Sequence, residues 1–400
     1  MALGAFRTSP RVSLCAEAAE APLSVRRNIL TSNFLVALSQ FPQISIYQSI
    51  FSHPKPNCLS HPTKHILTNL ENSINCKLKL NALPPITSSF PPWAFPQPNI
   101  RLDLTELPKT NDSVFRKHIT KLLDESPEHI LCLTDGSKVN KKTAYAYSIN
   151  NQIKAYRIRN SASVYAAELN AILACVAQIA QLKPQQNYLL LTDSLSSLQA
   201  LADPFSTNPL IQRIHLSLLT IDSLRSQITF LWIPGHIGFP PHEAVDAAAR
   251  QATSLPFITD PIPSPAKDLK TFYSHIIINK WVTNWKQQTN NKLRKIKGEP
   301  IPWSSSNRES RREEVILSRL RIGHTQLTHS YIFLNLMPPS CPHCMEDNLT
   351  VEHFFTCPAL RTTRSSMKIS SSAQSALCNN TNTITKMFTY LRSTRFYEYI

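Results

Sequence analysis

The sequence has 400 residues, of which 42% are hydrophobic, and a formal net charge of +16. No stretch approaches the ~18 consecutive apolar residues of a membrane span, so we expect no membrane contact. The charge favours a polyanionic partner such as nucleic acid, although a solvated basic surface gives the same balance. The nine cysteines are an odd number and mostly isolated, unlike a secreted disulfide framework. We therefore expect an intracellular protein, nuclear or cytoplasmic rather than secreted.

Two segments precede the first strongly patterned region. Residues 1–80 include a moderately apolar stretch at Ile29–Leu38 and are expected to be helical. Residues 81–126 are rich in proline, which predicts a stiff linker with little regular structure. Neither segment contains residues whose types and spacing suggest chemistry.

Residues 127–255 have the pattern of a mixed α/β domain. The first strand is expected at Ile130–Ser137, an apolar run that stops at Asp135. Eight elements follow: strands at Thr143–Ile149, Gln152–Ile158, Tyr188–Thr192 and Ile228–Trp232, and helices at Ser163–Ala180, Ser194–Leu201, Pro209–Ser223 and about Glu243–Thr253. This order predicts a five-stranded mixed sheet, with three antiparallel strands, two parallel additions and helices on its faces.

Four carboxylates of this domain are candidate metal ligands. Asp135 and Asp193 each follow a buried strand, so both are expected at one sheet edge, where neighbouring like charges are costly without a cation. Glu168 and Asp246 lie on helices, and only the fold can bring them to that edge. Four such groups suit two Mg²⁺ or Mn²⁺ ions that promote phosphodiester hydrolysis. His236 is a candidate proton shuttle. Taken singly, each residue has an ordinary alternative as a cap or loop hydrogen-bonding group.

Four motifs occur in a fixed order in this domain: TDGS at 134–137, AELNAI at 167–172, TDSLSSL at 192–198, and WIPGHIG with HEAVD between 232 and 246. They resemble the ribonuclease H type 1 family, in the version found in Jockey-like non-LTR retrotransposon polyproteins. The resemblance implies a ribonuclease H-like fold and two-metal cleavage of the RNA strand of RNA/DNA hybrids. It implies that Asp135, Glu168, Asp193 and Asp246 bind two Mg²⁺ (or Mn²⁺) ions and that His236 assists proton transfer. It also implies that four residues approach the nucleic-acid backbone: Gly136, Ser137, Asn160 and Ser161.

Two residues depart from that family, which usually has glycine and asparagine before the glutamate of the last helix. This chain has Pro241 and His242 there. Proline cannot take the positive φ that glycine adopts readily. We therefore expect an altered His236 loop and weakened activity.

The C-terminal third combines positive charge with a metal-ligand motif. Residues 256–266 are expected to form a second linker, and 267–335 a basic helical region. Its basic residues and tryptophans favour contacts to a nucleic-acid backbone, and a solvated helix with Trp281 and Trp285 in its core gives the same pattern. Residues 261–400 contain 19 Lys and Arg against 9 Asp and Glu. Within 336–360, four residues spaced C-x2-C-x8-H-x3-C predict a tetrahedral zinc knuckle: Cys341, Cys344, His353 and Cys357. Residues 361–400 are expected to be a tail.

Three further stretches resemble the same polyprotein family: ALGAFRTSP at 2–10, EAPLSVRRNIL at 20–30 and RLRIGHTQLTH at 319–329. They imply that residues 1–80 are a helical remnant from downstream of a reverse transcriptase, in a truncated copy without the polymerase palm. The predicted function is metal-dependent cleavage of RNA/DNA hybrids. An alternative is an inactive remnant that binds nucleic acid. A third reading is an integrase-like nuclease, which the positions of Glu168 and His236 disfavour. Protein partners are unknown at this stage.

Overall fold

The computed structural model describes residues 3–51, 65–86, 91–106 and 112–400. The chain forms two compact units. One comprises Thr31–Ser274 and is called the sheet unit here; the other comprises Met1–Leu30 with His275–Ile400 and is called the helical unit. Helices α2 (Leu23–Leu38) and α10 (Ala266–Lys286) connect the two along the chain. In the described parts of the chain, no helix has the length and apolar character needed to span a bilayer.

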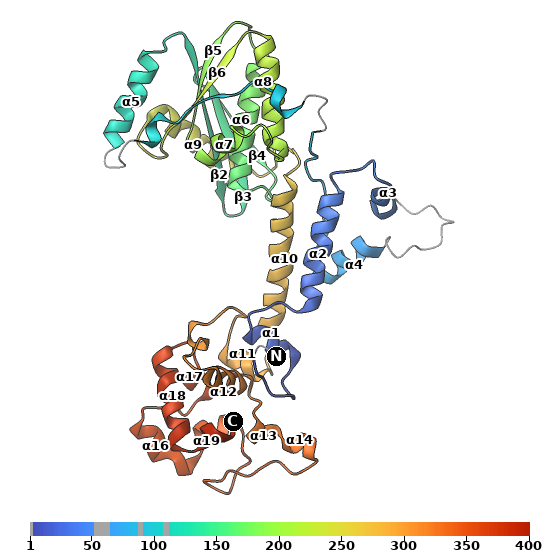
Figure 1. Ribbon diagram of the computed structural model, residues 1–400, viewed down its shortest axis with the longest axis vertical. Helices are drawn as coiled ribbons and strands as arrows, with labels where there is room; N and C mark the ends of the chain where they lie inside the picture. The colour runs from blue at the N-terminus through green and yellow to red at the C-terminus, as the bar shows by residue number, and fades with distance from the viewer. Residues whose placement is uncertain (1–2, 52–64, 87–90, 107–111) are drawn as a thin grey trace. The chain divides into compact units, whose positions relative to one another are not determined.

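The sheet unit is built on a mixed six-stranded sheet (Figure 1). The strand order is β1-β6-β5-β2-β3-β4. Strands β2, β3 and β4 are antiparallel neighbours, whereas β5, β6 and β1 continue from β2 in parallel. The strand bounds are β1 Asn99–Arg101, β2 His129–Val139, β3 Lys142–Ile149, β4 Gln152–Ile158, β5 Asn187–Thr192 and β6 Gln227–Trp232. The mixed α/β class, with three antiparallel strands and parallel additions, is confirmed.

Two features of the sheet differ from the prediction. The sheet has six strands rather than five, because β1 pairs in parallel with the edge strand β6, with Ile100 opposite Phe230. Strand β2 also continues through Val139, so Asp135 lies within the strand and not at its end. Gly136 also belongs to the strand, because its backbone stays in register with Tyr145 of β3.

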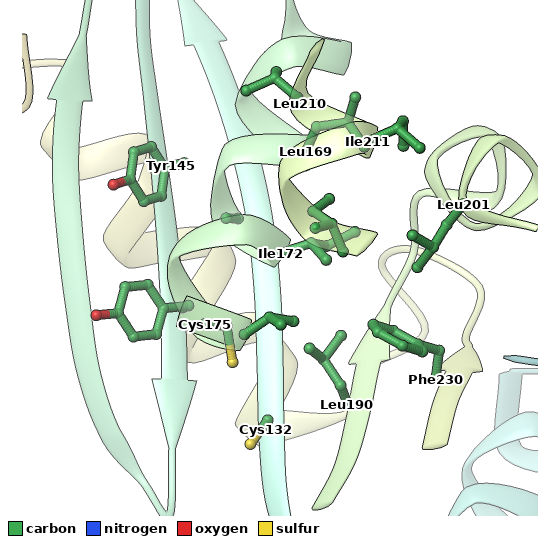
Figure 2. Packing of buried hydrophobic residues seen from close by; sticks show 14 of the residues in the cluster. Cys132, Tyr145, Leu169, Ile172, Cys175, Leu190, Leu201, Leu210, Ile211 and Phe230 are labelled. Carbon is green, nitrogen blue, oxygen red and sulfur yellow. The ribbon is translucent and has the colours of Figure 1, made fainter. Parts of the chain in front are cut away.

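Helices cover both faces of the sheet (Figure 1). On one face α6 (Val164–Ile179), α7 (Leu195–Leu201) and α8 (Pro209–Ser223) bury an apolar core that includes Ile172 and Phe230. Figure 2 shows the side chains of α6 directed at the strands, with Cys175 above Cys132. On the other face α5 (Asp112–Asp124) and α9 (Pro240–Ala252) pack on the odd-numbered residues of β2 and β5, such as Leu133 and Leu191. The alternation follows from the two-residue period of a strand.

Regions predicted as linkers contain ordered elements of the sheet unit. Apart from the gaps in the description, residues 81–126 hold β1, α5 and the 3₁₀ turns η2 (Pro92–Ala94) and η3 (Asp103–Thr105). Residues 256–264 follow the edge of the sheet, where Asp260 accepts a hydrogen bond from the Tyr145 hydroxyl at 2.6 Å. The unit also contains α3 (Ser45–Phe51) and α4 (Ile66–Ile74), in the region predicted to be helical.

The helical unit has its own apolar core. It joins α1 (Arg11–Glu17) to C-terminal helices, whose bounds are α11 Lys292–Ile296, α12 Arg311–Ile322, α13 Gln326–His329, α14 Tyr331–Leu334, α15 Val351–Thr356, α16 Arg361–Ser366, α17 Ala373–Ala376, α18 Thr381–Ser393 and α19 Phe396–Tyr399. Two 3₁₀ turns complete it, η4 (Ser304–Ser306) and η5 (Pro358–Leu360). Residues 361–400, expected to be a tail, instead form much of the core, because Ile384, Met387, Phe388 and Leu391 give α18 an apolar face.

A buried ionic cluster ties α1 to the C-terminal helices of the helical unit. The Glu17 carboxylate lies 3.4 Å from Arg321 Nη1 and 3.7 Å from Lys297 Nζ, and all three side chains are almost fully buried. Arg321 also donates to the hydroxyls of Ser305 and Ser306 at 2.8 and 2.6 Å. Burial raises the pKa of Glu17, and the two cations oppose that shift. Removing one partner of such a cluster strongly destabilises the fold, because it leaves a buried charge unpaired.

Candidate active site and metal centre

Two aspartates lie side by side where the parallel pairing of β2 and β5 stops. The last parallel pair is Thr134 with Thr192, so Asp135 and Asp193 are the next residues on the two chains. Asp135 is 5% exposed. Gly235, in the loop after β6, lies directly against Asp193. A Cβ at residue 235 would lie 2.7 Å from Asp193 Oδ2, so glycine allows the loop to come this close to the carboxylate. The predicted convergence of these two carboxylates at one sheet edge is present in the structure.

Glu168 is brought to the same edge by a close approach of α6 to β2. A Cβ on Gly136 would lie 2.5 Å from the backbone nitrogen of Glu168, so only glycine fits there. The Gly136 backbone also hydrogen bonds to the Glu168 carboxylate. Burial, together with Asp135 and Asp193, raises the pKa of Glu168 well above its ordinary value. The sequence predicted that Gly136 contacts nucleic acid; the structure gives it this packing requirement as well.

The carboxylates strongly perturb one another. Burial raises the pKa of Asp135 to about 7, and the charges of Asp193 and Asp246 act in the same direction. Arg250 opposes the shift. A group of acids that resists ionisation in this way is typical of sites that function with a bound cation.

Three buried polar atoms at this edge lack hydrogen-bond partners among the described residues: Asp135 Oδ2, Glu168 Oε2 and His242 Nε2. Buried polar atoms are normally paired, because an unpaired one loses its hydration without compensation. Ligand atoms of Asp135, Asp193 and His242 all lie within 4.8 Å of one another. The donor set therefore fits a divalent cation.

The last helix begins earlier than predicted, at Pro240 instead of about Glu243. Pro240 and Pro241 occupy its first turn, where the fixed φ suits the helix and no N–H is required. The positive φ angles of the preceding loop belong to His236 and Gly238. Proline at residue 241 is therefore compatible with the backbone of this site. The expected change in loop shape and activity stays a prediction.

Asp246 and His236 lie next to the central group. One Nη2 of Arg250 contacts both carboxylate oxygens of Asp246, at 3.1 and 2.9 Å. His236 Nδ1 lies 3.8 Å from Asp246 Oδ2, and its side chain is 77% exposed. In this conformation Asp246 is held by an arginine, and within the described residues it is not part of the compact ligand group.

His242 is the site residue that sequence reasoning missed. Its side chain is 5% exposed and faces Asp193 and Asp246, while burial lowers its pKa. The sequence marked it only as a departure from the resembling family. A usable signal was its position four residues before Asp246, which places both side chains on one face of α9.

The remaining residues expected to approach nucleic acid are partly exposed near the start of α6. Asn160 Oδ1 accepts a hydrogen bond from Arg157 at 3.2 Å, and the hydroxyl of Ser161 contacts that of Ser264 at 2.8 Å. Ser137 is half-buried on β2. Their role in binding stays a prediction.

The four predicted zinc ligands meet in the helical unit. Their ligand atoms all lie within 4.8 Å of one another. The sulfurs of Cys341 and Cys357 are 3.8 Å apart, and Cys344 Sγ is 3.4 Å from His353 Nε2. A tetrahedral ion with sulfurs at about 2.3 Å separates them by about 3.8 Å. Asp347 lies 3.6 Å from His353 Nδ1, in the position of a carboxylate that orients a metal-binding histidine. The cluster therefore fits zinc.

Comparisons with known proteins give little further information. No protein-family model matches the sequence, and no curated protein matches it. One similar solved structure is ribonuclease H1 from the halophilic archaeon Halobacterium salinarum NRC-1, with 18% sequence identity. The match covers 31% of this chain and 96% of that chain, with a TM-score of 0.25. We draw no conclusion about fold or activity from a likeness at this score.

Proposed function

We propose that the sheet unit is a ribonuclease H-like domain that hydrolyses the RNA strand of RNA/DNA hybrids with divalent metal ions. The observation that supports this most directly is a pair of buried carboxylate oxygens at one sheet edge, Asp135 Oδ2 and Glu168 Oε2, that have no hydrogen-bond partner among the described residues. The order of the four motifs, which resembles ribonuclease H type 1, supports the choice of substrate.

The proposed roles follow from position and exposure. Asp135, Asp193 and Glu168 would hold the cations, which when bound activate water and stabilise charge on the leaving oxygen. Asp246 would contribute after its contact with Arg250 opens. His236 projects into solvent beside Asp246, where it can exchange a proton with bound nucleic acid and with water.

The helical unit is proposed to add nucleic-acid affinity. Its Cys341, Cys344, His353 and Cys357 cluster would hold zinc and fix the surrounding fold. The excess of Lys and Arg over Asp and Glu in residues 261–400 suits contacts to phosphates. The proposed origin, a retrotransposon polyprotein, rests on the sequence motifs alone.

A second candidate function is nucleic-acid binding without cleavage. It is favoured by the contact of Arg250 with both oxygens of Asp246, which engages a proposed metal ligand with a competing cation. If this pair does not open, the metal group would lack one carboxylate.

The test is cleavage of an end-labelled RNA/DNA hybrid by the full chain with Mg²⁺ or Mn²⁺, against double-stranded DNA and RNA. The Asp193→Asn variant removes a proposed ligand, and Asp222→Asn is its matched control on the exposed surface of α8. Hybrid-specific cleavage that is lost only in Asp193→Asn supports the nuclease. Absence of cleavage from the folded parent refutes it. Salt-dependent binding that survives Asp135→Asn would then support the binding function.

A further inference from the structure

His242 has a buried ring nitrogen with no assigned partner. The residue is 5% exposed, and Nε2 contacts no hydrogen-bonding group among the residues described. A ring nitrogen of His242 lies within 4.8 Å of carboxylate oxygens of Asp135 and Asp193. The imidazole therefore belongs to the same compact donor group as the two aspartates.

The packing around this ring holds it at the site. The backbone of Thr134 and the charges of Asp193 and Asp246 favour the protonated ring and oppose the lowering of its pKa by burial. A metal-binding histidine commonly binds the ion through one ring nitrogen, while the other donates its N–H to a backbone carbonyl or a carboxylate. Val245 and Ala249 of α9 are fully buried against the sheet and hold the helix in place.

We infer that His242 is a direct ligand, through Nε2, of a divalent transition ion shared with Asp135 and Asp193, and that the site consequently prefers Mn²⁺ to Mg²⁺. This rests on the metal site of the proposed function and specifies its ligands. Mg²⁺ takes oxygen ligands and keeps several waters, whereas imidazole suits transition ions. One nitrogen ligand among carboxylates therefore shifts the metal preference of the site from Mg²⁺ towards Mn²⁺.

A purely structural role accounts for less of the geometry. A histidine that only fills space beneath α9 would leave Nε2 dehydrated and, among the described residues, without a hydrogen-bond partner. A structural role for His242 also gives no partner to Asp135 Oδ2, which has no hydrogen-bond partner among the described residues. A cation between these atoms pairs both at once and reduces the repulsion between Asp135 and Asp193.

The test is Mn²⁺ binding to the full chain, first loaded with one equivalent of zinc to occupy the thiolate site. Electron paramagnetic resonance gives the Mn²⁺ dissociation constant, and pulsed measurements detect ¹⁴N coupling from a directly bound imidazole. His242→Asn is compared with His215→Asn, a control on α8 that also removes a buried histidine. Circular dichroism establishes that both variants fold.

We expect ¹⁴N coupling in the parent and in His215→Asn, and its loss in His242→Asn with Mn²⁺ binding weakened at least about 10-fold. Mg²⁺ affinity, measured by competition, should change less. Bound Mn²⁺ without ¹⁴N coupling in the parent overturns the inference, whatever the variants do. Coupling that persists in His242→Asn also overturns it. Cleavage is scored separately: coupling without hybrid cleavage refutes the proposed function alone, and cleavage without coupling refutes this inference alone.

Discussion

Replacing Asp135 with asparagine is expected to stabilise the sheet unit at neutral and alkaline pH. Burial and the nearby acids raise the pKa of Asp135 to about 7 from an ordinary value of 3.8. At 1.36 kcal/mol per pKa unit, this difference corresponds to about 4 kcal/mol. Asp135 is 5% exposed, so solvent screening reduces the figure little.

The sign of the effect follows from which state binds the proton. Between about pH 4 and 7 the folded protein keeps a proton on Asp135 that the unfolded chain has released. The stabilising contribution of protonated Asp135 is therefore complete below about pH 4 and is lost as the pH rises through about 7. Asparagine is uncharged at every pH and keeps this contribution. Asp135→Asn and the parent should be equally stable at pH 4 and differ most at pH 8.

The assay is amide hydrogen exchange of peptides covering β2 and β5 in the full chain, with one equivalent of zinc and no other divalent cation. After correction for intrinsic rates, about 4 kcal/mol slows exchange about a thousandfold at pH 8. Asp222→Asn, on the exposed surface of α8, should leave the rates unchanged. Adding Mn²⁺ should stabilise the parent and reduce its difference from Asp135→Asn. Equal exchange in Asp135→Asn and parent at pH 8 would show that the carboxylates are not crowded.

Three further predictions concern packing and the zinc site. Gly136→Ala should destabilise the sheet unit by about 1–3 kcal/mol, because its Cβ would lie 2.5 Å from the Glu168 backbone nitrogen. Gly298→Ala, whose Cβ would only contact Arg294 Nη1 at 3.9 Å, is the control, and equal thermal stability of the two variants would refute the close contact. Glu17→Gln should cost the helical unit about 3–5 kcal/mol, measured by hydrogen exchange in α12, because it leaves two buried cations unpaired. The exposed Glu20→Gln should cost under about 1 kcal/mol, and a similar loss in both would contradict a special role for burial. Cys344→Ser should abolish stoichiometric zinc binding measured by a chromophoric chelator, whereas Cys378→Ser should retain it.

Much of the sheet was predictable because its signals are local. Ile130–Leu133 and Tyr188–Leu191 are apolar runs that each end near an aspartate, and parallel pairing brings those aspartates together. Strand β1 could not be predicted in the same way. This strand has only three residues and follows a proline-rich stretch, so its sequence is too short to show the alternation of a strand. Its position in the sheet depends on the pairing of Ile100 with Phe230. The three- and four-residue spacing of the buried apolar residues in α18 is readable in the sequence and predicts a helix with one buried face.

The site was less predictable, because its chemistry depends on contacts between distant residues. The sequence indicates Glu168 as a ligand candidate, but only the backbone approach at Gly136 explains its position. The sequence shows His242 as a substitution, and its nearness to Asp193 appears only after α9 packs on β2. The pairing of Glu17 with Arg321 has no local signal at all, since 304 residues separate them.

The two metal groups relate to stability in opposite ways. The Cys341, Cys344, His353 and Cys357 group forms within one short stretch, and its sulfurs already lie at tetrahedral spacing. Removing a ligand there takes away part of what holds the helical unit together. Asp135, Asp193 and His242 come from β2, the end of β5 and α9, and the fold holds the two aspartates together against their mutual repulsion. Removing a carboxylate there should stabilise the sheet unit. That contrast is the pattern expected when one group maintains structure and the other is kept for chemistry.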